Sequence, residues 1–129
     1  MNYFNKGICH LFMPIILVAF HASCVKPGKG GMAEIKGYVK HHSTVIPNAV
    51  VCIKYGAKEF PGDDLSIYDE QILTTGTDAS YEFTELKKGD YYLFSVGYDS
   101  TIMEPVKGGV PVLILKKAET ADVNIPVAE

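Results

Sequence analysis

The sequence predicts an all-β domain in the form of a β-sandwich, in a chain of 129 residues. From about residue 33 onward, no stretch keeps a 3.6-residue apolar period, whereas two-residue alternation and runs of β-branched or aromatic residues recur. Clusters of Gly, Pro, Asn and Asp interrupt these runs every ten residues or so, a spacing typical of sandwiches. Apolar residues make up 47 % of the chain and charged residues 21 %, which indicates a folded and not a disordered protein.

Seven short segments carry the strand pattern. They are residues 35–39, 49–55, 67–75, 81–83, 91–98, 110–115 and 121–127. In the first segment Ile35, Gly37 and Val39 alternate with Lys36 and Tyr38, and Lys40 continues the pattern just after it, which indicates a strand with one solvated face. Pro111 and Pro126 favour sheet edges for the last two segments, because proline cannot donate a ladder hydrogen bond.

The segments between these strands have the composition of turns and loops. A polar turn at 41–44 follows the first strand, and Pro47 and Asn48 break the chain before the second. A long loop at 56–66 contains a Pro-Gly-Asp-Asp sequence, and shorter turns are expected at 76–80 and 87–90. We find no internal repeat.

The N-terminal residues 1–23 have the pattern of an export signal. Residues 8–20 form an apolar run of 13 residues, too short to span a bilayer, which needs roughly 20. The sequence His-Ala-Ser-Cys at 21–24 resembles a bacterial lipobox, with Cys24 as the lipidated residue, although His21 stands where an aliphatic residue is usual. The alternative is an ordinary signal peptide cut near Ser23.

Lipidation of Cys24 would attach the protein to a membrane of the cell envelope. Residues 24–32 would then form a flexible tether, and residues 33–129 the folded domain. Val25 is not the Asp that often marks inner-membrane retention in lipoproteins, so the outer membrane is favoured. Cys52 would be the single remaining thiol, which excludes an internal disulfide.

The charge balance argues against a nucleic-acid partner. The chain has 12 lysines and no arginine against 15 acidic residues, for a net charge of −3. Such a composition offers no strongly basic face that could displace counterions from phosphates.

The order of several short motifs resembles a known group of domains. The motifs are IKGYV at 35–39, IPNAVV at 46–51, TD at 77–78, YEF at 81–83, LKKGDYYL at 86–93 and GY at 97–98. Together they resemble the carboxypeptidase-regulatory-like domains, also called prealbumin-like or transthyretin-like, to which Cna-B domains are related. The pattern departs from that group at Ser80, where a glycine is usual. The resemblance implies a seven-stranded Greek-key sandwich without catalytic residues or cofactors.

Relatives of this group can carry an intramolecular isopeptide bond between a lysine and an asparagine. Lys40 and Asn124 occupy plausible places for it, but Ser95 stands where the required acid would lie. We therefore expect no such bond, because the acid is needed to neutralise the amine and polarise the amide.

Three other groups of residues are candidate sites, each with a structural alternative. His41 and His42 could ligate a metal, but a solvated turn is favoured and no metal is expected. Cys52 is interpreted as a small packed hydrophobe. The remaining group is acidic and could bind Ca²⁺, although a solubilising loop is favoured. It comprises Asp63, Asp64, Asp69, Glu70 and Asp78.

The strand at 91–98 has apolar residues on both faces. If Tyr91 faces the core, as the resemblance implies, the opposite face presents Tyr92, Phe94 and Tyr98. An apolar row there needs either a cover, which the loop at 56–72 could supply, or a partner. Tyr92, Phe94 and Tyr98 are therefore the candidate binding surface for sugars or an envelope protein.

Three functional hypotheses follow. The favoured one is a non-enzymatic, lipid-anchored cell-envelope protein that acts as an interaction or accessory module. The second is a surface lipoprotein that binds a polysaccharide or a small ligand on its aromatic strip. The third is a transthyretin-like hydrolase, which would have to use His41 and His42, since no nucleophile and base are otherwise suggested.

Overall fold

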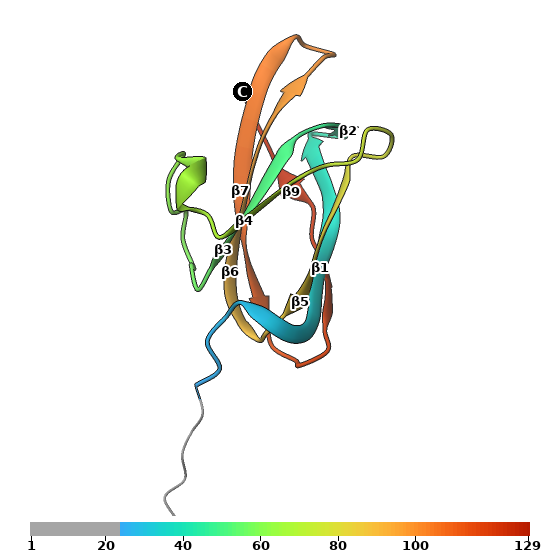
Figure 1. Ribbon diagram of the computed structural model, residues 1–129. Coiled ribbons are helices and arrows are strands. Elements are labelled where there is room, and N and C mark those ends of the chain that lie inside the picture. The colour runs from blue at the N-terminus through green and yellow to red at the C-terminus, as the bar shows by residue number, and fades with distance from the viewer. Residues whose placement is uncertain (1–23) are drawn as a thin grey trace, which may run out of the picture.

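A computed structural model describes residues 24–129, which form two β-sheets packed face to face (Figure 1). The first sheet is organised around β1, which pairs with β2 and β5 in antiparallel and with β8 and β9 in parallel orientation. These strands are β1 (Lys29–His41), β2 (Thr44–Val45), β5 (Ser80–Leu86), β8 (Thr120–Asp122) and β9 (Ile125–Pro126). Residues 34–36 contact β8 along one edge of β1, and β5 lies along its other edge.

The second sheet is antiparallel and has the order β4-β3-β6-β7. Its strands are β3 (Val50–Tyr55), β4 (Glu70–Leu73), β6 (Gly89–Asp99) and β7 (Glu104–Ile114). A short 3-10 helix, η1 (Leu65–Ile67), lies in the long loop between β3 and β4. The expected all-β sandwich is therefore confirmed.

The core fills the space between the two sheets. Alternate residues of each strand point inward, so that Ile35 of β1, Ile53 of β3 and Leu93 of β6 are completely buried. Tyr91 belongs to the same core, and its hydroxyl donates to the carbonyl oxygen of Lys87 at 2.6 Å.

Residues 24–129 contain nine strands where seven were expected, but strands lie where the sequence predicted them. Each expected segment contains a strand, whereas the last one is divided into β8 and β9 and the short β2 is additional. The division has a local cause. A Cβ on Gly37 would lie 1.8 Å from the carbonyl oxygen of Val123, so the main chain crosses β1 very closely there. The side chain of Asn124 also accepts the Tyr38 N–H at 3.1 Å. Pro111 lies on β7, at an edge of its sheet, as expected.

The boundary of the folded domain is earlier than expected. Strand β1 begins at Lys29, inside the segment 24–32 that we expected to be a flexible tether. Gly28 is buried, and its N–H and carbonyl bond to the Tyr91 hydroxyl at 3.0 Å and the Lys87 N–H at 2.9 Å. A Cβ on Gly31 would lie 1.9 Å from Leu86 O. These glycines therefore permit close approach of the backbones, which sequence composition alone does not distinguish from flexibility.

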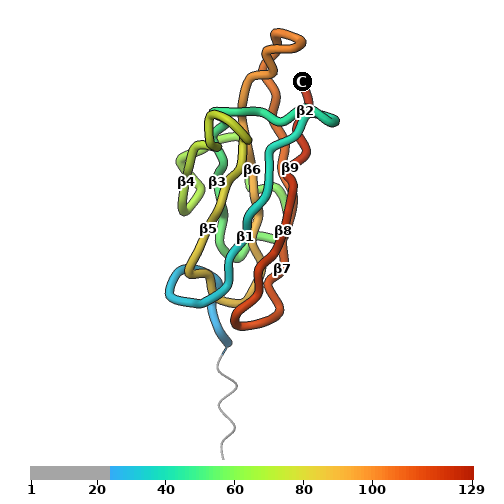
Figure 2. Tube along the Cα trace, turned by 90° about the vertical axis from the view of Figure 1, so that its right-hand side faces the viewer, coloured from blue at the N-terminus to red at the C-terminus, as the bar shows by residue number. Residues whose placement is uncertain are grey.

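The two ends of the sandwich are different. Residue 24 lies at one end, near the β5–β6 and β7–β8 turns, and the hairpin between β6 and β7 projects from the other (Figures 1 and 2). Cys24 is exposed, whereas the expected signal peptide lies outside the described residues. Within residues 24–129, no helix has the length and apolar character that crossing a bilayer requires.

Candidate functional site

A second apolar cluster lies on the outer face of the sheet β4-β3-β6-β7. Its buried members are Cys52, Tyr68, Tyr92 and Phe94. The loop between β3 and β4 covers it, with the Tyr68 and Phe94 rings stacked at a centroid distance of 5.7 Å. Tyr92 and Phe94 are only 9 % and 2 % exposed. They do not form an open strip, and the expectation that the loop covers this face describes the structure better.

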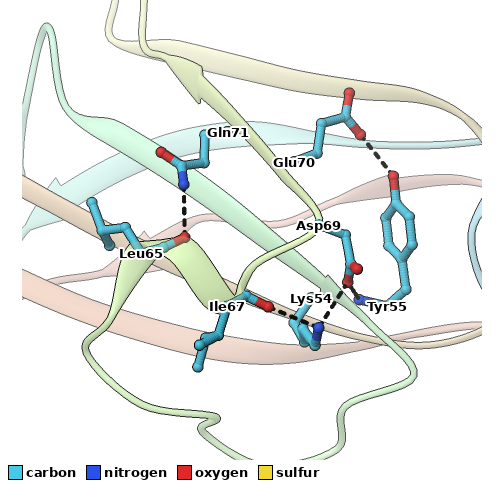
Figure 3. Close-up of polar contacts among 7 residues, drawn as sticks. All are labelled: Lys54, Tyr55, Leu65, Ile67, Asp69, Glu70 and Gln71. Atoms are coloured by element: carbon cyan, nitrogen blue, oxygen red, sulfur yellow. Dashed lines mark hydrogen bonds and ion pairs between the residues drawn. The ribbon is translucent and has the colours of Figure 1, made fainter.

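Polar contacts hold the covering loop to the sheet at its β4 end (Figure 3). The Lys54 ammonium donates to the carbonyl oxygen of Ile67 at 2.8 Å and lies 3.4 Å from the Asp69 carboxylate. That carboxylate also accepts the Tyr55 N–H at 2.7 Å, and the Tyr55 hydroxyl donates to Glu70 at 3.0 Å. Residues on β3 therefore fix the point where the loop enters β4.

Further contacts shape the loop itself. Asp64 accepts the Ser66 N–H at 2.9 Å and so caps η1. The hydrogen bond from the Ser66 hydroxyl at 2.7 Å, together with that N–H, lowers the pKa of Asp64. Gln71 donates to the carbonyl oxygen of Leu65 at 2.7 Å (Figure 3). Burial raises the pKa of Tyr68 to about 12, so its hydroxyl stays protonated while it donates to the Gly62 carbonyl at 2.9 Å.

The acidic residues considered for calcium each have a protein partner. Asp63 pairs with Lys107 at 3.0 Å, and Asp78 accepts hydrogen bonds from Thr75 and Ser80 in its own turn. No three metal-ligating side chains come together in the part of the chain that the structure describes. These carboxylates are engaged in shaping loops and holding them in place.

A hollow of about 350 Å³ remains open between the covering loop and β7. It is lined by Phe60, Asp63, Tyr92, Phe94, Lys107, Gly108 and Gly109. Phe60 is 49 % exposed, and its ring centroid lies 5.9 Å from that of Tyr92 and 5.1 Å from that of Phe94. Gly109 allows the Tyr92 ring to lie against β7 beside the hollow, because a Cβ there would lie 2.6 Å from that ring.

The hollow combines apolar rings with polar groups at its margin. The Asp63–Lys107 pair is well exposed, with 61 % and 59 % of the two side chains accessible. Burial raises the pKa of Tyr92, so its hydroxyl is neutral at physiological pH. Among the contacts of residues 24–129, that hydroxyl has no hydrogen-bond partner. The site can therefore hold a molecule that has both an apolar face and hydroxyl groups.

Tyr98 is separated from the other two residues of the expected binding surface. It lies on β6 and is 55 % exposed, but it belongs neither to the outer cluster nor to the lining of the hollow. The structure thus brings Tyr92 and Phe94 together and leaves Tyr98 apart.

His41 is not part of a solvated turn, contrary to our expectation. It ends β1 with its side chain buried, and its Nδ1–H donates to Asp99 of β6 at 2.8 Å. This hydrogen bond raises the pKa of His41 and lowers that of Asp99. The Glu129 carboxylate lies 2.9 Å from Nε2, an ion-pair distance when His41 is protonated, and it also raises the pKa of His41. His42 is exposed.

The residues considered for an isopeptide bond have other roles. The Lys40 ammonium lies over the Tyr38 ring, 5.7 Å from its centroid, while Asn124 binds the Tyr38 backbone. Ser95 is buried and donates to the carbonyl oxygen of Val50 at 2.9 Å. Cys52 is fully buried, which raises the pKa of its thiol to about 11.

Comparison with known proteins gives a structural neighbour but no sequence relative. No protein-family model and no curated protein matches this sequence. The fold is similar to the crystal structure of a "putative carbohydrate binding protein" from Pseudomonas aeruginosa, with a TM-score of 0.51 and 14 % identity. The match covers 77 % of this chain and 90 % of that one. At this identity the likeness shows the shared all-β fold.

The sequence pattern predicted only part of the lining of the hollow. Tyr92 and Phe94 were expected on the outer face, but Phe60 and Lys107 were not assigned to a site. The pair of glycines at 108–109 was the available signal, since glycine inside a strand pattern often marks a close approach of another group.

Proposed function

We propose that this domain binds a saccharide in the hollow between the covering loop and β7. The observation that carries the proposal is the grouping of three aromatic rings, those of Phe60, Tyr92 and Phe94, beside the Asp63–Lys107 pair. The sequence suggested that a polysaccharide would bind to an open aromatic strip. We now propose the hollow as the binding site instead.

The chemistry of a sugar suits this combination. One face of a pyranose ring presents C–H groups that can pack on an exposed aromatic ring, and Phe60 offers such a ring. The hydroxyl groups at the rim of the sugar need donors and acceptors, which Lys107, Asp63 and the Tyr92 hydroxyl supply. The description of the structural neighbour as a "putative carbohydrate binding protein" agrees with this proposal, but the proposal is based on the residues of the hollow.

A binding measurement with single substitutions tests the proposal. Residues 24–129 would be screened against soluble polysaccharides and oligosaccharides, and hits quantified by calorimetry. Phe60→Ala should weaken binding about tenfold while changing stability little, because the ring is half exposed. Asp63→Asn should weaken it less, since the amide keeps an acceptor.

Tyr98→Ala is the matched control, because it removes a comparably exposed aromatic residue outside the hollow. Binding by this variant should equal that of the native protein. Loss of binding in Tyr98→Ala with retention in Phe60→Ala would place the site elsewhere, and no binding to any saccharide would refute the proposal.

The cellular setting of the proposal is the cell envelope. We propose that Cys24 is lipidated and anchors a non-enzymatic domain, with the outer membrane favoured. The exposed position of Cys24, five residues before β1 begins at Lys29, supports this arrangement. A Cys24→Ser protein should leave the membrane fraction, and retention equal to that of the native protein would contradict the anchor.

A second candidate function is an interaction module for an envelope protein. The β6–β7 hairpin exposes 42 % of Ile102 and 74 % of Met103 at its tip, at the end of the sandwich away from Cys24 (Figure 1). In-cell crosslinking should then capture a discrete partner that is lost in an Ile102→Ser/Met103→Ser protein. An unchanged crosslinking pattern would exclude the hairpin as its binding surface.

A further inference from the structure

The end of the sandwich where residue 24 lies carries a group of lysines. They belong to three segments that are distant in sequence, namely the start of the described chain, the β5–β6 turn and the β7–β8 turn (Figures 1 and 2). We call them the end lysines: Lys26, Lys87, Lys88, Lys116 and Lys117.

Two neighbouring surface hollows show that these segments meet. Val25 and Lys88 border both of them. The first hollow also includes Leu115, and the second also includes Lys87 and Lys117. Val25 and Leu115 are 48 % and 68 % exposed, so this end presents apolar side chains among its positive charges.

The end lysines differ in their pairing from the other lysines of residues 24–129 except Lys40, whose ammonium lies over the Tyr38 ring. Across residues 24–129, none of the five has a carboxylate within 4.0 Å of its ammonium group. In contrast, five lysines elsewhere have one: Lys29, Lys36, Lys54, Lys58 and Lys107.

The acidic residues near these turns leave an excess of positive charge. The Glu119 carboxylate accepts hydrogen bonds within its own loop, from the N–H groups of Leu115 and Lys116, both at 2.9 Å. Asp90, which follows the β5–β6 turn, pairs with Lys58 at 3.9 Å. Even with Glu85, Asp90 and Glu119 counted in full, the five lysines leave a surplus of two positive charges. Residues 24–129 have 11 lysines and 15 acidic residues, a net charge of −4, so the sign at this end is opposite to that of the whole domain.

We propose that this end of the sandwich docks on a bilayer surface and binds anionic phospholipid headgroups. Unpaired lysines next to a membrane are attracted to such headgroups, and exposed Val25 and Leu115 can enter the interface between them. The proposal rests neither on lipidation of Cys24 nor on the saccharide hollow. It sets an orientation in which the β6–β7 hairpin points away from the membrane.

Vesicle binding by a protein without lipid tests this inference. The described sandwich lies entirely within residues 24–129, so this segment with Cys24→Ser is the protein to use. It should sediment with phosphatidylcholine vesicles containing phosphatidylglycerol at least tenfold more strongly than with pure phosphatidylcholine vesicles. The binding should be lost in 0.5 M NaCl, where screening acts within a few ångströms.

Paired substitutions locate the surface. Lys87→Ala/Lys88→Ala and Lys116→Ala/Lys117→Ala should each weaken binding to the anionic vesicles by more than tenfold, since one lysine contributes roughly fivefold. Lys40→Ala/Lys107→Ala removes the same charge elsewhere, since Lys107 pairs with Asp63 in the long loop, and this variant should bind like the parent protein. Equal binding to neutral vesicles, insensitivity to salt, or equal loss in the control variant would overturn the proposal.

Discussion

The two faces of the sheet β4-β3-β6-β7 both bury aromatic side chains, but they do so in different ways. On the inner face the Tyr91 ring lies between two hydrogen-bonded sheets, and its hydroxyl is satisfied by Gly28 and Lys87. On the outer face Tyr92 lies under a loop and beside an open hollow. One strand can therefore supply a permanent core residue and a ligand-facing residue at consecutive positions, because successive side chains point to opposite faces.

Truncation of these neighbouring tyrosines is the strongest test of the contrast. Tyr91→Ala should lower the free energy of unfolding by about 3–5 kcal/mol, the usual cost of removing an enclosed aromatic ring. Tyr92→Ala should cost about 1–2 kcal/mol, because the loop can settle into the space beside the hollow. Urea denaturation of both variants measures the difference. Equal losses would show that the outer cluster is as integral to the fold as the inner core.

Thiol labelling of Cys52 tests the same contrast between the two faces of the sheet. It detects local opening of the covering loop, which costs less free energy than unfolding of the domain. Cys52 lies under the covering loop with its pKa raised by burial to about 11, so it should react much more slowly than exposed Cys24. Labelling should then proceed through local opening of the loop and depend little on low urea concentrations. Asp69→Ala, which removes the contacts to Lys54 and Tyr55, should accelerate it about fivefold.

The control for this experiment is Asp122→Ala, an exposed carboxylate on β8 in the other sheet. It should leave the Cys52 labelling rate unchanged. If Cys52 reacted only at urea concentrations that unfold the whole domain, the loop would not open separately from the core.

The pH dependence of the free energy of unfolding tests a contact on the inner face of the sheet. We expect it to be the smallest of the effects predicted here. His41 and Asp99 bridge the two sheets at one end of the core. Because the pKa of His41 is raised from 6.5, its contribution is complete below pH 6.5 and is lost as pH rises through the raised value. Because the pKa of Asp99 is lowered from 3.8, its contribution is present above pH 3.8 and is lost in stronger acid.

The pair should therefore stabilise the domain most between about pH 4 and 6.5. Urea denaturation of native protein should give a higher stability at pH 5.5 than at pH 8.5. His41→Gln should remove most of this difference. A difference of the same size in His41→Gln would assign the pH dependence to other groups.

Local sequence patterns predicted most of the strands, but they predicted few of the contacts between residues that are distant in the sequence. Alternation in 91–98 correctly separated Tyr91 from Tyr92, and the apolar residues of the long loop correctly suggested a cover. The position of His41 was predicted wrongly, since its partner Asp99 lies 58 residues away and polar neighbours indicated a turn. Membership of the carboxypeptidase-regulatory-like group and lipidation of Cys24 stay predictions.

The path of β1 determines how the domain would respond to mechanical load. This strand starts five residues after Cys24 and runs toward the other end of the sandwich, with β5 bonded along one edge and β8 and β9 along the other (Figure 2). A pull between Cys24 and the β6–β7 hairpin would act along β1, roughly perpendicular to its antiparallel hydrogen bonds. Those bonds would be loaded in shear and would have to break together, a geometry that resists extension far better than unzipping one bond at a time.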